Sequence, residues 1–326
     1  MKKFLIIQTA FIGDVVLATP LIEKLKRFYP DAEIDFLVRK GNEGLLKGHP
    51  KLHNVLVWDK SHAKYGNLAS LGRTIRKTKY DVLINLQRFA SSGLLTTSSG
   101  AKERIGFSKN PFSALFTKKV PHVIDRETHE VERNLALIES LTDKSFQRPV
   151  LYPSEKDFEL TEKYKNGIYY CMAPASVWFT KQFPEEKWVE LINRMNPDHR
   201  VYLLGSPDDL PLCASIQKAN IQGNVHILAG ELSLLQSAAL MRDARMNYVN
   251  DSAPMHLASA MNAPVTAIYC STIPEFGFGP LSDQSHIVQI DYPLSCRPCG
   301  LHGKKACPKG HFKCAWDIDV DKIPLK

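Results

Sequence analysis

The chain has 326 residues, of which 44% are hydrophobic, 23% charged and 9% aromatic, and this ordinary globular composition excludes the disordered, collagen-like and disulfide-miniprotein classes. At roughly 100–200 residues per domain, the length suggests two domains. The net charge of +8 lies entirely in residues 1–160 and reaches +12 (16 basic against 4 acidic residues) between residues 39 and 119, which indicates an anionic partner such as nucleic acid, phosphorylated lipid or a membrane surface.

The first apolar run, Lys3–Gln8, is expected to be a buried strand and not a secretory signal. Gln8 interrupts the run, Asp14 would lie inside a longer signal segment, and no small-residue cleavage site follows. No apolar stretch approaches the roughly 20 residues that span a bilayer. We therefore expect a soluble or peripheral protein whose cysteines are reduced, as is the default in the cytosol.

Short runs that are apolar on both faces alternate with helical patterns along the whole chain, which is typical of an open parallel α/β sheet. The expected strands are Lys3–Gln8, Glu33–Arg39, Val55–Asp59, Asp81–Leu86, Arg104–Phe107, Ile168–Ala173, Arg200–Gly205, Asn224–Leu228, Met246–Asn250, Val265–Cys270 and Ile287–Ile290. The expected helices are Val15–Tyr29, Asn67–Lys77, Val131–Leu141, Glu185–Asn196, Ser233–Arg242 and Met255–Met261.

A weak internal repeat predicts two Rossmann-like domains. Lys3–Arg39 and Ile168–Gly205 share the order strand, short loop, helix, Pro near the helix end, strand. We place the domains at 1–160 and 161–326, with the boundary in the polar stretch Pro149–Asn166. Parallel sheets bind ligands at the carboxyl ends of their strands. With two sheets facing each other, the cleft between the domains is the expected active site.

Gly13 and Asp14 follow the first strand and open a helix. Asp14 either caps this helix, which is worth about 1 kcal/mol, or projects from the sheet edge as a carboxylate that accepts a proton. A surface aspartate with a pKa near ~3.9 is a weak base. Because Gly13 stands alone, the G-x-G-x-x-G fingerprint of nicotinamide dehydrogenases is absent.

The stretch Asn250–Ala260 follows another strand and opens a helix with Asp251, Ser252, Ala253 and Pro254. The free backbone N–H groups and the dipole at such a helix start are suited to a diphosphate. His256 lies near the same end. Capping by Asp251 or Ser252, together with a histidine buried for packing, is an equally good explanation.

Two further charged residues follow strands of the second half. Lys181 lies in the loop after Ile168–Ala173 and could neutralise a phosphate, although an isolated loop lysine is usually only solvated. Glu231 follows Asn224–Leu228 and could hold a ribose hydroxyl pair. A carboxylate at the start of a helix is the commoner explanation for Glu231.

A cluster of four cysteines near the C-terminus has the spacing C-x2-C-x7-C-x6-C, with two histidines among them. Thiolates at these spacings could close a tetrahedral zinc site, which would be structural because four thiolates leave no open catalytic position. Reduced cysteines used for packing are the alternative, and the presence of only one C-x2-C pair favours them. The residues are Cys296, Cys299, Cys307, Cys314, His302 and His311.

Together, the Gly13-Asp14 turn, Lys181 before Phe183-Pro184, and the string from Asp251 to Ala260 are similar to glycosyltransferase family 9, the ADP-heptose:lipopolysaccharide heptosyltransferases. The resemblance spans nearly the whole chain, including the late cysteines. Ala253 departs from it, because the family usually has glycine there. A methyl group at that position constrains how closely a phosphate approaches the backbone.

The resemblance implies a GT-B fold of two Rossmann-like domains and an inverting, metal-independent transfer without a cofactor. Asp14 would be the general base. The donor would be ADP-heptose, with its charge stabilised by Lys181, His256 and the backbone N–H groups of Ser252 and Ala253. In addition, Glu231 would hold the ribose, and Asp251 the heptose hydroxyls or the helix start.

The basic N-terminal domain would then bind the acceptor, a phosphorylated lipid A–Kdo core, at the inner, cytoplasmic face of an anionic membrane. The candidate contacts are Lys60, Lys64, Arg88 and Arg104, each of which could instead be a solvated surface charge. A monomer is expected. The alternatives are a GT-B enzyme with another nucleotide sugar, and a basic nucleic-acid-binding protein with a zinc knuckle, although no aromatic-basic RNA motif is present.

Overall fold

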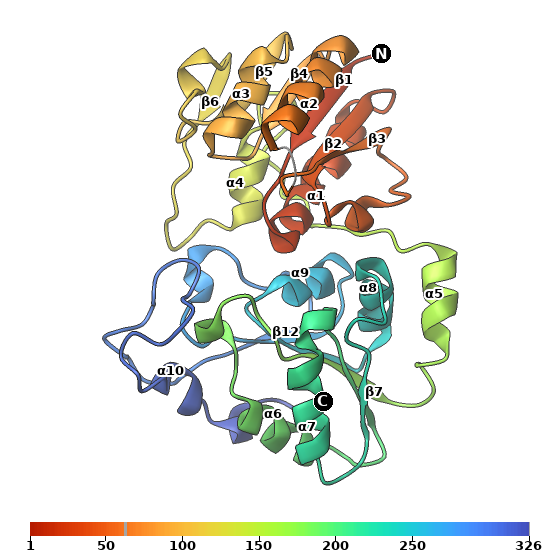
Figure 1. Ribbon diagram of the computed structural model, residues 1–326, viewed down its shortest axis with the longest axis vertical. Helices are drawn as coiled ribbons and strands as arrows, with labels where there is room; N and C mark the ends of the chain where they lie inside the picture. The colour runs from red at the N-terminus through yellow and green to blue at the C-terminus, as the bar shows by residue number, and fades with distance from the viewer. Residues whose placement is uncertain (62–63, 326) are drawn as a thin grey trace. The chain divides into compact units, whose positions relative to one another are not determined.

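The structure is a computed structural model that describes residues 1–61 and 64–325. These residues form two compact units, the first ending at Tyr152 and the second beginning at Pro153. Each unit has its own parallel sheet with helices on both faces (Figure 1). The expected boundary after residue 160 falls inside α5 (Glu155–Glu162). None of the helices in the described part of the chain has both the length and the apolar character that a membrane span requires.

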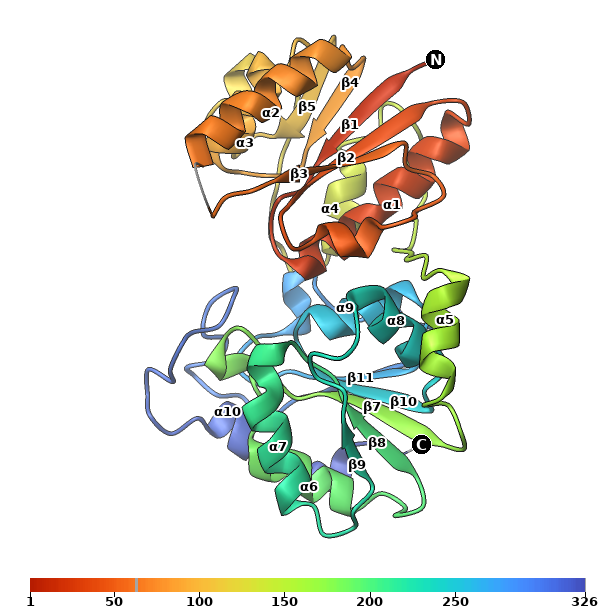
Figure 2. The same ribbon diagram turned by 45° about the vertical axis from the view of Figure 1, so that its right-hand side comes forward.

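The sheet of the first unit has the strand order β3-β2-β1-β4-β5-β6. Helices α1 and α4 pack together on one face, and α2 and α3 on the other (Figures 1 and 2). The strands are β1 (Lys3–Ile7), β2 (Glu33–Arg39), β3 (Asn54–Trp58), β4 (Val82–Asn85), β5 (Glu103–Phe107) and β6 (Lys118–Val120). The helices are α1 (Ile12–Phe28), α2 (Lys64–Thr78), α3 (Ala90–Ser98) and α4 (Glu130–Ala136).

Helix α1 continues through Pro20, a residue that usually ends a helix. Proline has no N–H for the carbonyl four residues earlier, here that of Val16. The Thr19 hydroxyl donates to this carbonyl at 2.8 Å, which satisfies it. The same hydroxyl accepts the Val150 N–H at 3.1 Å. Thr19 therefore keeps α1 intact and attaches the end of the first unit to it.

The sheet of the second unit has the strand order β12-β11-β10-β7-β8-β9. Helices α6 and α7 pack on one face, while α5, α8 and α9 pack on the other (Figure 2). The strands are β7 (Tyr169–Ala173), β8 (Arg200–Leu203), β9 (Val225–Ile227), β10 (Met246–Asn250), β11 (Val265–Ile268) and β12 (Ser285–Val288). The helices after α5 are α6 (Glu185–Asn193), α7 (Leu210–Ala219), α8 (Leu234–Asp243), α9 (Ala253–Ala260) and α10 (Lys313–Trp316).

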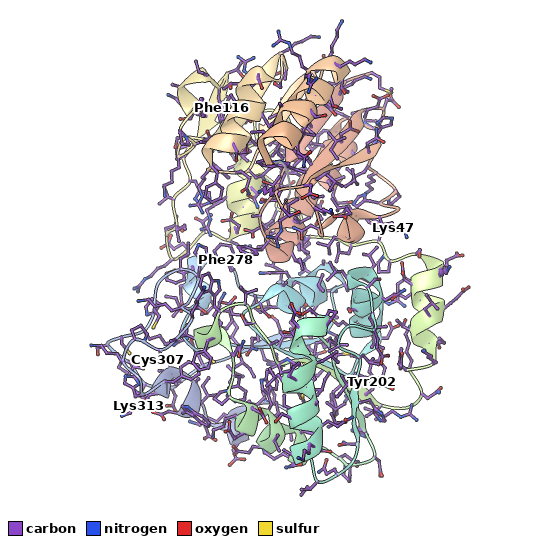
Figure 3. The ribbon with its side chains drawn as sticks, in the orientation of Figure 1. Lys47, Phe116, Tyr202, Phe278, Cys307 and Lys313 are labelled. Carbon is purple, nitrogen blue, oxygen red and sulfur yellow. The ribbon has the colours of Figure 1, made fainter. Side chains whose placement is uncertain are left out.

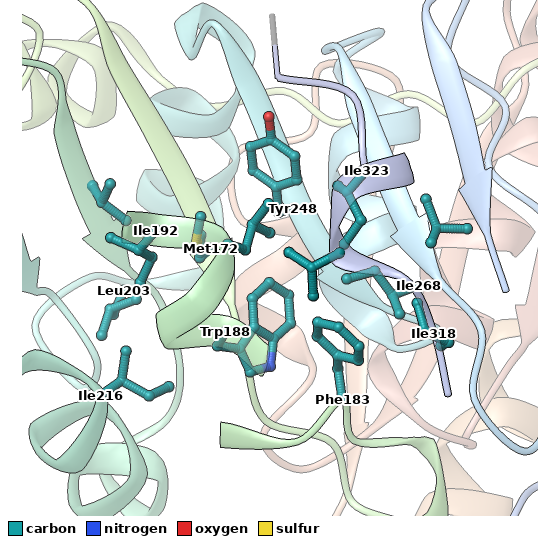
Figure 4. Packing of buried hydrophobic residues seen from close by; sticks show 14 of the residues in the cluster. Met172, Phe183, Trp188, Ile192, Leu203, Ile216, Tyr248, Ile268, Ile318 and Ile323 are labelled. Carbon is teal, nitrogen blue, oxygen red and sulfur yellow. The ribbon is translucent and has the colours of Figure 1, made fainter. Parts of the chain in front are cut away.

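The core of the second unit is closed by the C-terminal segment of the chain. Trp188 of α6 and Tyr248 of β10 are fully buried, and Ile318 and Ile323 pack into the same cluster (Figure 4). The Tyr248 hydroxyl donates to the Pro324 carbonyl at 2.9 Å. Burying each large apolar side chain stabilises the fold by about 1.5–3 kcal/mol, so residues after α10 are part of this domain and not a tail.

The expected parallel α/β architecture is confirmed, and each expected strand is present with its ends shifted by at most two residues. Among the α-helices and strands of the described residues, five were missed: β6, α3, α5, α7 and α10. Strand β6 is a three-residue edge strand with two lysines, so it shows no apolar run. Helix α5 lies in the stretch interpreted as a polar linker, although Ser154 and Asp157 form a capping box there.

Candidate active site

Asp14 lies at the carboxyl edge of the first sheet, in the third position of α1. Phe11 precedes the helix and has no capping side chain. The Asp14 carboxylate accepts the Phe11 N–H at 3.1 Å, so it stabilises the helix start from inside the first turn. Its side chain remains partly exposed. The stabilising role and a chemical role are therefore compatible.

The protein environment makes Asp14 a better base than a surface aspartate. Burial, and next the negative charge of Glu130, raise the pKa of Asp14 to about 6, against the smaller lowering effects of the Phe11 N–H and Arg88. The assumption of a surface aspartate with a pKa near ~3.9 was therefore wrong. A carboxylate with a pKa closer to neutrality accepts protons more readily and is still ionised at pH 7.

Glu130 is held as an anion on α4. Burial favours its neutral form, but hydrogen bonds from His122 and Arg133 outweigh burial and lower the pKa of Glu130. Arg133 Nε lies 2.7 Å and His122 Nε2 3.3 Å from the Glu130 carboxylate. Asn134 of the same helix donates to the Leu17 carbonyl of α1 at 3.2 Å. This bond fixes α4 against the helix that carries Asp14.

The substitution Glu130→Gln is expected to lower the pKa of Asp14. The amide keeps hydrogen-bonding groups for Arg133 but removes the negative charge that disfavours a second anion. A ¹³C NMR titration of the side-chain carboxyls, with the Asp14 signal assigned by its loss in Asp14→Asn, measures the shift. Glu132→Gln on the same helix is the control, because Glu132 is exposed and caps α4. An unchanged Asp14 midpoint in Glu130→Gln contradicts this electrostatic coupling.

A pocket of about 530 Å³ lies in the same unit, with mostly aromatic and apolar walls. Among the lining residues that the structure describes, Lys60 is the one with an ammonium group. The ammonium donates to the Thr9 carbonyl at 2.9 Å and lies 4.5 Å from the centre of the Trp58 ring. It is thus a positioned cation and not merely a solvated one. The lining residues are Thr9, Trp58, Lys60, Leu68, Phe89, Ala90, Ser91, Ser92, Leu94 and Phe112.

The other basic candidates are placed differently. Arg88 follows β4 and lies close enough to Asp14 to lower its pKa. Arg104 lies near the start of β5, and its guanidinium donates to the Ala101 carbonyl at 2.7 Å, so the structure does not bring it to the Asp14 edge. Lys64 is the first residue of α2, but its side chain lies outside the described part of the structure.

In the second unit, Lys181 and Asp251 form an ion pair of 2.7 Å, and both side chains are largely buried. The Thr272 hydroxyl donates to the same Asp251 oxygen at 2.6 Å. These residues follow β7, β10 and β11, which are neighbours in the sheet. The carboxyl ends of the three strands therefore bring together residues that are far apart in the sequence.

Ser252 is the N-cap residue of α9, but its side chain makes no capping hydrogen bond. Instead, its hydroxyl donates to the Asn250 carbonyl at 3.3 Å. Asp251, which was expected either to cap or to bind ligand, holds Lys181. Ala253 is the first residue of α9, and His256 is buried in the next turn. The helix start and the ammonium of Lys181 thus form one positively polarised edge.

Glu231 lies after the edge strand β9 and is exposed. Its carboxylate accepts the Tyr164 hydroxyl at 3.4 Å. The two residues line a pocket of about 460 Å³ together with Arg200, Tyr202 and His226. Tyr202 is labelled in Figure 3. Neither Lys181 nor Asp251 is among the described residues that line this pocket.

Sequence reasoning missed two residues that organise this edge. Asn250 is fully buried, accepts the Phe183 N–H at 2.9 Å and donates to the Pro174 carbonyl at 2.7 Å. It therefore holds the Lys181 loop against β10. Thr272 belongs to no motif in the sequence, whereas Asn250 begins the stretch Asn250–Ala260 that the sequence analysis singled out. A polar residue at the end of a buried strand was the available signal for Asn250.

The four late cysteines lie between β12 and α10 or within α10 (Figure 3 labels Cys307 and Lys313), and line a pocket of about 330 Å³ with His311. The Cys296 sulfur is 3.8 Å from His311 Nε2. Burial and the neighbouring thiols raise the pKa of Cys314 to about 12. Within residues 1–61 and 64–325, no three His, Cys, Asp or Glu side chains are arranged to hold a metal ion. The donor atoms suit zinc, but their present arrangement does not form the tetrahedral site.

Two parallel-sheet α/β domains with a polarised helix start in the second unit are the architecture of the GT-B fold, and comparisons with known glycosyltransferases agree. The model of "Glycosyltransferase family 9 (heptosyltransferase)" matches residues 68–308. The chain therefore belongs to glycosyltransferase family 9, as its motifs indicated.

Curated relatives and solved structures cover most of the chain. Lipopolysaccharide heptosyltransferase 3 of Escherichia coli is 27% identical over 80% of this chain and 82% of its own. Lipopolysaccharide heptosyltransferase 2 of E. coli K12 is 26% identical over 88% of each. The family 9 glycosyl transferase of Veillonella parvula has a TM-score of 0.85 at 21% identity, and the match covers 99% of this chain and 95% of that one. The E. coli ADP-heptose lps heptosyltransferase II has a TM-score of 0.77 at 24% identity, and the match covers 92% of this chain and 96% of that one.

Proposed function

We propose that the protein transfers L-glycero-D-manno-heptose from ADP-heptose to the inner core of lipopolysaccharide, with inversion and without a catalytic metal. The curated relatives are named lipopolysaccharide or lipooligosaccharide heptosyltransferases. One structural neighbour is described as an E. coli heptosyltransferase with ADP. The observation that carries the proposal is the Lys181–Asp251 pair beside the uncapped start of α9.

On the donor side, the diphosphate of ADP-heptose binds at the start of α9. The backbone N–H groups of Ser252 and Ala253 and the ammonium of Lys181 stabilise its negative charge, and this charge grows as ADP leaves. Asp251 holds Lys181 in place and contacts the heptose hydroxyls. His256 lies beside the diphosphate, and Glu231 accepts hydrogen bonds from the ribose.

On the acceptor side, Asp14 is the general base. The acceptor oxygen forms a bond to the anomeric carbon from the face opposite ADP, and the bond from that carbon to the diphosphate oxygen breaks. ADP leaves with the electron pair, and Asp14 takes the hydroxyl proton. Attack from the opposite face inverts the anomeric centre. The raised pKa of Asp14 supports this role.

The basic first unit binds the phosphorylated lipid A–Kdo acceptor. The strongest individual candidates are Lys60, which lines the aromatic pocket, and Arg88, which lies near Asp14. Lys64 and Arg104 are the remaining candidate contacts. The net charge of +12 between residues 39 and 119 favours a monomer acting at the anionic, cytoplasmic face of the membrane.

A nucleotide comparison tests the donor. ADP at 100 times its Kd is expected to stabilise the folded protein by about 2.7 kcal/mol, and UDP and GDP at the same concentration by much less. Differential scanning fluorimetry measures the difference. A larger shift with UDP or GDP supports the alternative GT-B enzyme with another nucleotide sugar.

An ADP-release assay then tests the acceptor. We expect ADP release from ADP-heptose with truncated lipid A–Kdo cores that carry zero, one or two heptoses. The core that gives the highest rate of ADP release identifies the position that is modified. EDTA-treated enzyme is expected to keep its rate. Absence of release with every core contradicts the proposed acceptor class, and loss of the rate with EDTA contradicts metal independence.

A further inference from the structure

The segment Arg297–Lys304, which contains Cys299, contacts Thr180, the residue next to Lys181. Thr180 donates its backbone N–H to the Lys304 carbonyl at 3.1 Å, and its side-chain oxygen accepts the Lys304 N–H at 2.8 Å. The Ser271 hydroxyl donates to the same Thr180 oxygen at 2.9 Å. The Ser271 N–H also donates to the Thr180 carbonyl at 3.2 Å, so the residue immediately before Lys181 is fixed by four hydrogen bonds. Two of them come from Lys304, a residue far along the chain.

Gly303 contacts Lys181 itself. Its backbone has a φ of +77°, a left-handed conformation that favours glycine. A Cβ atom at this position would lie 2.9 Å from the Lys181 Cγ and 3.1 Å from the Thr180 hydroxyl oxygen. Cγ belongs to the buried stem of Lys181 and not to its flexible end. Only a residue without a side chain fits here while Lys181 keeps its present rotamer.

The other end of the segment fixes the partner of Lys181. The Arg297 guanidinium donates to the carbonyls of Cys270 and Thr272, each at 2.7 Å. Thr272 is the residue whose hydroxyl bonds to Asp251. The Cys299 N–H donates to the Ser271 carbonyl at 2.8 Å, between these contacts. The segment Arg297–Lys304 therefore holds both members of the Lys181–Asp251 pair indirectly. It acts on Lys181 through the preceding residue Thr180, and on Asp251 through Thr272.

We propose that Arg297–Lys304 is a positioning element for the donor diphosphate site, and that Gly303 is the residue that sets the position of the Lys181 ammonium. This inference rests on the proposed function, because it assigns Lys181 to the nucleotide diphosphate. None of these segment residues needs to touch the donor. They act through Lys181 and Asp251, whose geometry decides whether the diphosphate meets the ammonium and α9 together.

The test is Gly303→Ala, with Gly300→Ala as its matched control. Gly300 lies in the same segment and has a φ of +84°, and apart from its chain neighbours no described residue has a heavy atom within 4 Å of its Cβ position. Both substitutions therefore strain the backbone, but only Gly303→Ala displaces Lys181. In isothermal titration calorimetry with ADP, we expect Gly303→Ala to raise Kd at least tenfold and Gly300→Ala to change it less than threefold. Equal losses in both variants overturn the proposal.

A double variant separates positioning from general destabilisation. In a Lys181→Ala background the Cγ atom that opposes the new methyl group is gone, so Gly303→Ala is expected to add less than a twofold further rise in Kd for ADP. A full additional tenfold rise there overturns the proposal, because Gly303 would then act without Lys181.

An NMR readout keeps this test independent of the proposed donor. In ¹³C,¹⁵N-lysine-labelled protein, the Lys181 side-chain signals, assigned by their loss in Lys181→Ala, are expected to move in Gly303→Ala and not in Gly300→Ala. If the Lys181 signals move as expected but the wild-type protein does not bind ADP, the proposed donor fails and the positioning element stands. Unmoved Lys181 signals in Gly303→Ala overturn the positioning element, whether or not ADP binds.

Discussion

The substitution Asp14→Asn is expected to lower kcat for heptose transfer by roughly 10²–10⁴-fold, the usual contribution of a general base, while affinity for ADP-heptose stays nearly unchanged. An amide cannot take the acceptor proton. Its oxygen can still accept the Phe11 N–H that Asp14 accepts in the wild type, so the start of α1 is expected to remain folded. Steady-state ADP release and calorimetric donor binding measure the two quantities separately.

The pH dependence sharpens this prediction. Because Asp14 must be deprotonated to act, wild-type kcat is expected to rise with pH through about 6, the pKa of Asp14. Asp14→Asn is expected to lack this rise in its residual rate. An unchanged melting temperature in the variant excludes loss of the fold as the cause. Turnover close to that of the wild type removes Asp14 from the role of base.

The second large effect is expected for Lys181→Met, which removes the ammonium and keeps the aliphatic stem. A charge-assisted hydrogen bond contributes about 1.5–3 kcal/mol, so Kd for ADP should rise roughly 10–150-fold. Lys187→Met is the control, because Lys187 forms an ion pair with Glu190 on α6, away from the Lys181–Asp251 pair. Calorimetry with ADP gives the comparison, and equal Kd values for Lys181→Met and the wild type contradict a diphosphate role.

Removing the partner carboxylate separates its two proposed functions. Asp251→Asn keeps the ammonium of Lys181 and still offers an oxygen to the Thr272 hydroxyl. We therefore expect it to weaken binding of ADP-heptose more than binding of ADP. If both ligands weaken by the same factor, Asp251 acts only by holding Lys181. The double variant Lys181→Met/Asp251→Asn leaves no buried unpaired charge, and its unfolding free energy is expected to exceed that of Lys181→Met alone.

The sheets could be predicted because their central strands are continuous apolar runs. Strands β1, β4, β7 and β10 are almost wholly buried, and burial on both faces leaves a clear pattern in the sequence. Helix α3 gave no such pattern, because it consists mainly of Ala, Ser, Gly and Thr around two leucines. These residues have modest helix propensity, and tertiary packing against α2 holds the helix together.

The sequence predicted that Lys181 and Asp251 each follow a strand of the second sheet, but it did not predict that they form a pair. Lys181 and Asp251 were assigned separately to phosphate and to sugar or capping, whereas the strand order makes them an ion pair. The raised pKa of Asp14 could not be predicted either, because it depends on burial in the folded chain and on the charge of Glu130 in α4. The sequence offered no signal for the contact of Gly303 with Lys181.

The strand orders of the two sheets explain why charged residues lie at equivalent positions in both. In the first sheet the winding direction reverses between β1 and β4, and in the second between β7 and β10. Helices that follow such a pair of strands leave on opposite faces of the sheet and open a crevice between them. Asp14 and Arg88 flank the first crevice, and Lys181 and Asp251 flank the second. Each half thus carries one carboxylate and one cationic side chain at the reversal point of its own sheet. Substitutions in the four loops that carry these residues are therefore expected to change substrate preference without altering either sheet.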